Sequence, residues 1–244
     1  RVSEHSTLTA HELYGRLRYW KLQLTAGRRE QIIGRVDPSL SLGSTTWSRN
    51  ASPMPKVSLS STGYVTVPGT KDYLAADGYF AHGWLEEERF VRNAFIHEKY
   101  LYLRIFPADF PVTAHAGLVH HAQWGGTAPD FVGSGEGGEQ PASFEQWFDT
   151  VFGQRGPDEV AANHIAAYDF SVDVDAGPVQ GRIYRHFYHE DIASLWFRNV
   201  WDGLWGVNVQ WDESALVSGV LWEHFRLTRQ NARFSIGEER GSDQ

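Results

Sequence analysis

Apolar and polar residues alternate along most of this chain with a period of two. Between Ile165 and Asp175 the even-numbered positions are Ala, Tyr, Phe, Val and Val, whereas the odd-numbered positions after Ile165 are Ala, Asp or Ser. Lys99–Phe106 and Gly206–Asp212 repeat this alternation. A period of two is typical of β-strands with one apolar face, and about ten such residues match the length of a tilted strand that crosses a membrane.

Less regular alternation predicts further strands at Leu13–Tyr19, Trp20–Ala26, Tyr73–Trp84, Ala114–Trp124, Val179–Tyr188 and Ala215–Phe225. The turn residues at 175–178 predict a tight hairpin, whereas Arg28–Pro55 and Thr127–Pro141 are long and irregular. The predicted fold is therefore all-β, an antiparallel meander of about nine or ten strands with short turns at one rim and long loops at the other.

One short helix is predicted near 143–152. Ser143 and Gln146 have the spacing of a capping box, and apolar residues follow at helical intervals from Phe144 to Val151. No apolar run approaches the roughly 20 residues of a bilayer-spanning helix. We find no internal repeat and no linker, so a single domain over residues 1–244 is expected.

Charge and cysteine content exclude several classes of function. The chain has 22 Lys and Arg against 30 Asp and Glu, a net charge of −8, which argues against a nucleic-acid partner because such proteins need a basic face. It has no Cys, which removes disulfides, thiolate metal sites and cysteine nucleophiles.

The histidines do not form a convincing catalytic or metal site in the sequence. His120 and His121 are adjacent, so on a strand they point to opposite faces. His186 and His189 approach one another only if a strand ends between them, and their spacing matches no established ligand set. Carboxylates are plentiful, but no spacing selects an acid/base pair. We therefore expect no metal, no cofactor and no enzymatic activity.

Tryptophans are abundant near the ends of the predicted strands. A membrane barrel places such rings in two interfacial girdles, and a sugar-binding protein stacks them on pyranose faces. Both interpretations remain open for Trp84 and Trp124, which lie in polar segments rich in Gly and His.

Ordered sequence blocks resemble the capsule assembly protein family typified by Wzi, especially its Bacteroidetes-type members. These blocks are 27–34, 42–44, 47–51, 53, 55–57, 78–84, 89–99, 121–126, 163–164, 168–170 and 184–187. The resemblance implies a bacterial outer-membrane β-barrel of roughly eighteen strands that is closed by loops and a periplasmic helical element. It also implies a lectin-like function, which helps to hold capsular polysaccharide at the surface of a Gram-negative cell.

The resemblance further implies contact with outer-membrane lipid and a monomeric full-length protein. About half of a large barrel is present, and an open half would leave two sheet edges with unpaired backbone groups in hydrocarbon. The chain is then either a fragment of a longer protein or closes as a smaller barrel, and we favour a fragment that is poorly stable by itself.

The residues predicted to bind polysaccharide are Trp84, Arg92, Asn93, His97, Gln123 and Trp124. The alternative for each is a structural network in a polar lumen. Two other classes stay open: a soluble β-sandwich or jelly-roll lectin or polysaccharide lyase, and a diffusion porin.

Overall fold

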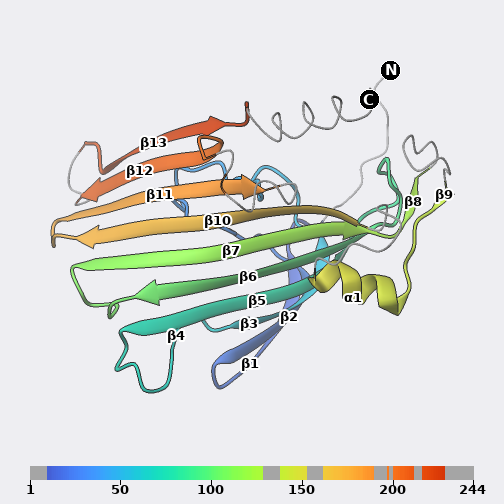
Figure 1. The fold of residues 1–244 in the computed structure, drawn as a ribbon, viewed down its shortest axis with the longest axis horizontal. Coiled ribbons are helices and arrows are strands. Elements are labelled where there is room, and N and C mark those ends of the chain that lie inside the picture. The colour runs from blue at the N-terminus through green and yellow to red at the C-terminus, as the bar shows by residue number, and fades with distance from the viewer. Residues whose placement is uncertain are drawn as a thin grey trace, which may run out of the picture.

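One large antiparallel sheet dominates the fold (Figure 1). The computed structural model describes residues 10–128, 138–152, 162–189, 197, 200–211 and 216–228. The strands of the sheet, in spatial order, are β1 (Leu13–Tyr19), β2 (Leu22–Arg28), β3 (Pro55–Ser61), β5 (Leu74–Trp84), β6 (Phe95–Ile105), β7 (Val112–Trp124), β10 (Ala162–Asp175), β11 (Val179–His189), β12 (Gly203–Trp211) and β13 (Gly219–Arg226). An eleventh strand, β4 (Val65–Thr66), pairs with β5. This confirms the predicted all-β meander.

The remaining elements lie between β7 and β10. A two-stranded ladder joins β8 (Thr127–Ala128) to β9 (Gly138–Glu139), and α1 (Phe144–Phe152) follows it. The helix confirms the prediction near 143–152, and the Ser143 hydroxyl accepts a hydrogen bond from the Gln146 amide at 3.1 Å. Part of the predicted irregular segment 127–141 lies outside the described residues.

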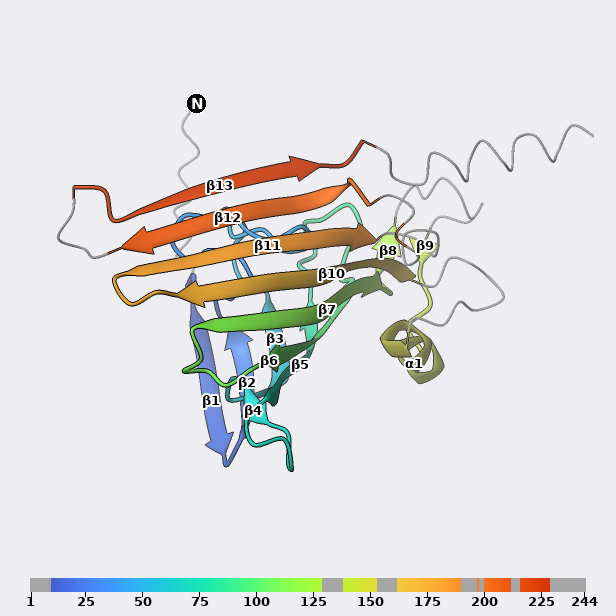
Figure 2. The ribbon, with the colours of Figure 1, turned by 60° about the vertical axis from the view of Figure 1, so that its left-hand side comes forward.

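The sheet is curved and open. Within the described residues its two edges are β1 and β13, which agrees with half of a barrel, and Figure 2 shows β1–β3 turned steeply against β10–β13. No helix in the described part of the chain is both long and apolar enough to cross a bilayer.

The two rims of the sheet differ, in part as predicted. At one end, which we call the turn rim, strands are joined by short connections at 20–21, 106–111 and 176–178 and by a longer one at 62–73 that contains β4. At the other end, which we call the loop rim, the connections are 29–54, 85–94 and 125–161. The hairpin at 176–178 includes Gly177 at φ 77°, a conformation that glycine adopts without steric cost.

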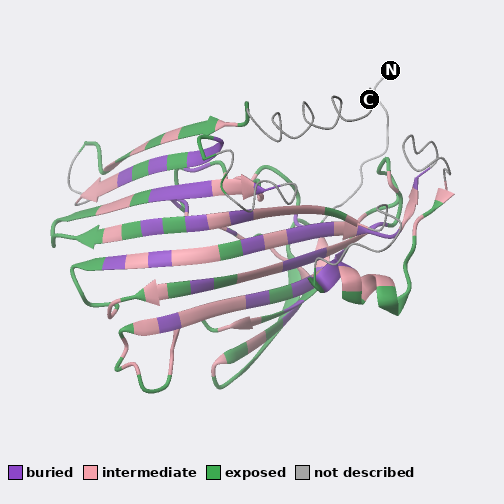
Figure 3. Ribbon diagram, in the orientation of Figure 1, coloured by how far each residue is buried: buried purple, intermediate pink, exposed green. Residues whose placement is uncertain are grey.

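Burial is inverted relative to a water-soluble sheet. On β10, Phe170 and Val172 are 40% and 41% exposed, whereas the intervening Asp169 and Ser171 are 1% and 4% exposed. Figure 3 shows this alternation of exposed and buried positions along β10 and its neighbours. We call the side that carries Asp169 the inner face and the side that carries Phe170 the outer face. The apolar face is therefore the exposed one.

Residues 29–54 explain why the inner face is buried. This connection, which we call the plug segment, leaves β2 at the loop rim and folds across the inner face before it enters β3. Ile33 packs against Tyr79 and Tyr102, and Val36 packs against Tyr184. The sequence predicted an irregular connection here but not its position inside the sheet. It also did not predict β3, the strand that follows.

Two tyrosines on the inner face lie across glycines of the next strand. Tyr102 is paired with Gly117, and its hydroxyl donates to Asp169 Oδ2 of β10 at 2.6 Å. Tyr184 is paired with Gly206, and its hydroxyl donates to Glu223 Oε1 of β13 at 2.5 Å. A Cβ on Gly117 would lie 2.2 Å from the Tyr102 ring, so only glycine leaves room for the tyrosine to reach its acid.

We expect Gly117→Ala to destabilise the protein by about 1–3 kcal/mol, because the displaced Tyr102 would leave the buried Asp169 carboxylate with one donor fewer. The denaturant midpoint of the full-length protein measures this. Gly78→Ala is the matched control, since a Cβ there meets nothing within 4 Å. Equal midpoints for the two variants would contradict the proposed role of the tyrosine and glycine pair.

Candidate functional site

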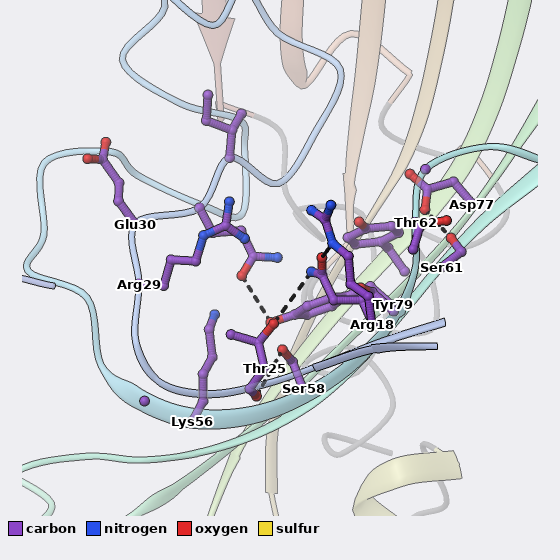
Figure 4. Close-up of a pocket in the computed structure, with 17 residues that line it drawn as sticks. Arg18, Thr25, Arg29, Glu30, Lys56, Ser58, Ser61, Thr62, Asp77 and Tyr79 are labelled. Atoms are coloured by element: carbon purple, nitrogen blue, oxygen red, sulfur yellow. Dashed lines mark hydrogen bonds between the residues drawn. The ribbon is translucent and has the colours of Figure 1, made fainter. Parts of the chain in front are cut away.

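A cavity lies between the plug segment and the inner face of the first strands (Figure 4). Its volume is about 560 Å³. One wall is residues 29–32 at the start of the plug segment, and the opposite wall comes from β1, β2 and β3, with contributions from β5 and β6. Sugar-binding and other small-molecule sites are commonly concave surfaces of this size.

Hydroxyl and amide groups line most of this cavity. The hydroxyl residues are Thr25, Ser58, Ser60, Ser61 and Thr62, and the amide residues are Gln23 and Gln31. Alternation on β2 and β3 puts Gln23, Thr25, Ser58 and Ser60 on the inner face and leaves the apolar Leu24 and Leu59 on the outer face. Such groups both donate and accept hydrogen bonds, as the hydroxyls of a sugar require.

Two stacked tyrosines form the deep side of the cavity. The rings of Tyr79 and Tyr100 are 5.1 Å apart with an interplanar angle of 12°. The Tyr79 hydroxyl donates to Gln31 Oε1 at 3.0 Å, which ties the plug segment to β5. Flat rings beside hydrogen-bonding groups are the combination on which a pyranose face can stack.

A buried ion pair supports the side of the cavity that these two tyrosines form. Lys56 Nζ donates to Glu98 Oε2 at 2.6 Å, and both side chains are almost fully buried. The ammonium also lies over the ring of Trp47, 4.6 Å from its centroid, and Trp47 stacks on His121. Removing one partner of such a pair leaves an uncompensated charge, so this cluster fixes the position of the plug segment beside the cavity.

Two guanidiniums in the cavity have no carboxylate partner within the described residues. Arg18 donates to the neutral Gln23 Oε1 at 2.7 Å, and Arg29 lies over the Tyr14 ring at 5.5 Å. The carboxylates of the cavity are otherwise engaged: Asp77 accepts from Ser61 at 2.5 Å, and Glu30 is 3.8 Å from Arg49. The cavity can therefore offer positive charge to an acidic ligand.

Arg35 anchors the middle of the plug segment to β10. Its backbone amide donates to Asp169 Oδ2 at 2.7 Å, and its Nε donates to Ser171 Oγ at 2.9 Å. Its terminal guanidinium nitrogen also contacts Asp173, which receives two further hydrogen bonds from Arg182. One arginine thus satisfies three successive inner-face groups of the same strand.

Two ionisable groups near the turn rim keep their ordinary charge states. Burial raises the pKa of Tyr64 to about 12, and its hydroxyl is 2.8 Å from His115 Nδ1. The Thr66 hydroxyl donates to Asp72 at 2.5 Å, and this hydrogen bond and the Arg104 guanidinium lower the pKa of Asp72. These contacts fix the connection around β4 against the sheet.

The structure brings three of the sequence-predicted binding residues together on the outer face, away from the cavity. Trp84 and Trp124 both contact His82, with ring centroids 5.7 and 5.5 Å apart, and His97 lies opposite His82 in the register of β5 and β6. Trp84 is 42% exposed, whereas Trp124 and His97 are buried.

The other three predicted residues lie apart from this cluster. Arg92 and Asn93 belong to the connection between β5 and β6, where Arg92 forms a backbone bridge with Thr127. Gln123 points to the inner face, because it neighbours Trp124 on the same strand. A binding role for any of the six stays a prediction.

The sequence interpretation missed the cavity for an identifiable reason. Arg18 and Gln23 lie in strands that are predicted from their apolar positions, whereas the polar positions of the same alternation line the cavity. Ser58 lies in β3, which the alternation did not predict. Within the described residues, no group of three or more His, Asp or Glu side chains is arranged to hold a metal ion.

Comparison with known proteins identifies one family. The family model for the capsule assembly protein Wzi matches residues 3–211, which is most of the chain. No curated protein and no solved structure matches the chain.

We expect Arg35→Gln to release the plug segment, because Ser171 and Asp173 would lose the guanidinium, and only the backbone amide bond to Asp169 would remain. Loss of about 1.5–3 kcal/mol of charge-assisted hydrogen bonding corresponds to roughly 10- to 100-fold more frequent local opening. Limited trypsin digestion after Arg49, followed by mass spectrometry, measures this opening. Arg28→Gln is the control, since Arg28 forms an exposed pair with Glu86 at 3.4 Å. Equal cleavage rates in the two variants would show that Arg35 does not anchor the segment.

Proposed function

The chain belongs to the capsule assembly protein Wzi family, and we propose that it binds capsular polysaccharide in the inner-face cavity, without cleaving it, while its strands cross the bacterial outer membrane. The single observation that carries the binding proposal is the cavity beside the plug segment, with its hydroxyl-lined wall and its two guanidiniums that meet no carboxylate in the described part of the chain. By holding the polysaccharide in this cavity, the protein helps to attach or assemble the capsule at the cell surface.

The inverted burial supports the membrane location. Residues such as Leu101, Leu118 and Phe170 are exposed on the outer face, where water would disfavour them and lipid would not. The polar inner face would correspond to the lumen of the barrel, which the plug segment fills. A filled lumen favours a binding protein over the alternative of a diffusion porin.

The chemistry of the cavity supports an acidic polysaccharide. The wall of β2 and β3 offers hydroxyls and amides for sugar hydroxyls, and the half-buried Tyr100, which is backed by the buried Tyr79, offers aromatic surface. Arg18 and Arg29 would pair with the carboxylate or other anionic group of the polymer at close range. This local attraction is needed because the chain as a whole carries a net charge of −8.

The loop rim is a second proposed contact for the same polymer. A polysaccharide that enters the cavity must continue beyond it, and the loop rim carries the predicted residues Trp84, Arg92 and Asn93. Trp84 is exposed at the last position of β5, so its ring is available for stacking. The buried His97 and Trp124 would pack beneath the residues of this rim and hold them in place. Gln123 would face the lumen.

We expect the double variant Arg18→Gln and Arg29→Gln to weaken binding of the purified capsular polysaccharide by about 10- to 100-fold, the loss typical of charge-assisted hydrogen bonds. Isothermal titration calorimetry on the full-length protein gives the affinity, and the amount of capsule shed into the medium gives the cellular effect. Arg28→Gln is the matched control, because Arg28 adjoins Arg29 in the sequence but pairs with Glu86 outside the cavity. Unchanged affinity in the double variant, with normal barrel assembly, would remove the cavity from the proposal.

The loop-rim contact is tested independently with Trp84→Ala and Arg92→Ala. We expect each variant to lower the affinity for long chains of the polysaccharide several-fold and to leave the affinity for a single repeat unit unchanged, because a short ligand occupies the cavity alone. The same calorimetry, performed with both ligand lengths, measures this. Equal effects on both lengths, or no effect on either, would contradict a separate rim contact.

A further inference from the structure

Helix α1 is fixed to the outer face of the sheet, on the opposite side from the plug segment (Figures 1 and 2). Lys99 of β6 lies on the same side of its strand as the outer-face residue Leu101, and its ammonium donates a hydrogen bond to the Val151 carbonyl. The last carbonyls of a helix have no partner within the helix, and a cation near them is favourable. Because α1 has no basic residue in its last turn, Lys99 supplies this charge from the sheet.

The helix buries one side and exposes another that is strongly apolar. Thr150 and Val151 are buried against the sheet, whereas Phe144, Phe148 and Phe152 are 78%, 43% and 60% exposed. Residues four apart advance by only about 40° around a helix, so the three phenylalanines form one continuous row. Glu145, Gln146 and Asp149 lie on the remaining side. A row of exposed phenylalanines is unfavourable in water and requires an apolar environment.

The surroundings of α1 indicate what this environment is. The helix follows β9 near the loop rim, and the outer face below this rim exposes Leu101 and Leu118. Trp84 and Phe95 lie at the rim itself, where membrane barrels carry an aromatic girdle. The phenylalanine row therefore extends the apolar outer face of the strands as far as the loop rim, where that face ends.

We propose that α1 is an interfacial membrane helix, which lies against the outside of the barrel at the loop rim and inserts Phe144, Phe148 and Phe152 into the lipid at the boundary between head groups and acyl chains. The proposal rests on the proposed outer-membrane location of the strands. Lys99 both holds the helix and keeps its own charge away from the lipid, because the carbonyl end of α1 covers it.

A site-specific label tests this proposal, because the chain contains no cysteine to compete for it. Phe148→Cys, Asp149→Cys and Leu118→Cys are each introduced into the full-length protein, labelled with bimane and folded into phosphatidylcholine vesicles. Lipids brominated along the acyl chain quench a probe that contacts lipid, and aqueous iodide quenches a probe that contacts water. The unsubstituted protein, treated with the same reagent, gives the background, and heat-modifiable gel migration confirms folding. Phe152→Cys replaces Phe148→Cys if the latter does not fold.

We expect brominated lipid to quench the probe at position 148 at least threefold more than the probe at position 149, and iodide to give the opposite order. The probe at Leu118, in the middle of the outer face, reports on the sheet itself. Quenching by brominated lipid at 118 but not at 148 would overturn the role of α1 and leave the membrane location standing. No lipid quenching at either position would overturn both. Protection of position 148 from both quenchers would show that another protein surface covers the helix.

Discussion

The buried carboxylate of Asp169 is the group on which the arrangement of the inner face depends. It is almost completely inaccessible to water, and a charge in this position is tolerated only when donors surround it. Arg35 provides a backbone amide and Tyr102 a hydroxyl, while His186 Nε2 lies 3.1 Å from the second oxygen. These groups come from the plug segment, β6 and β11, so one acid contacts three segments that are distant in the sequence.

Hydrogen bonds between the plug segment and polar groups of the inner face continue across the sheet. Asp37 of the plug segment accepts from Gln210 of β12 at 2.8 Å, and Ser41 donates to Glu223 of β13 at 2.8 Å. Apolar contacts at Ile33 and Val36 alternate with these polar ones along the segment. The interior is thus organised mainly by directional hydrogen bonds, which specify one position for the plug segment, whereas hydrophobic burial alone would tolerate small displacements. The cavity exists because the plug segment departs from β1–β3 at its beginning and meets β10–β13 further along.

The local features of the fold could be read from the sequence, and the long-range features could not. Alternation located β1 with its observed bounds and most other strands to within a few residues, because the period of two is a property of one segment. It missed β3, where Pro55 and several serines obscure the alternating Val57 and Leu59. The position of the plug segment depends on Arg35 and Asp169, which are separated by 134 residues, and no local pattern reveals such a pair. The sequence blocks that resemble the family include 27–34 and 47–51, so the resemblance marked the plug segment although the periodicity did not.

Two cations on the outer face, Lys99 and Arg185, are satisfied differently from those on the inner face. Inside, cations pair with acids, as Lys56 does with Glu98 and Arg182 does with Asp173. Two outer-face cations are satisfied by backbone carbonyls: Lys99 by Val151, and Arg185 by four carbonyls, including those of Val200 and Asp202, while its guanidinium lies between aromatic rings. Arg28 and Arg226, on the same face, pair with Glu86 and Asp202 instead. A carbonyl neutralises no charge, but it replaces the water that an apolar environment would remove. Lys99 and Arg185 each also bind a segment that lies outside the strands, since Lys99 holds α1 and Arg185 holds the chain before β12. For Lys99 and Arg185, therefore, the contacts that satisfy a costly charge are also the contacts that attach a loop-rim segment.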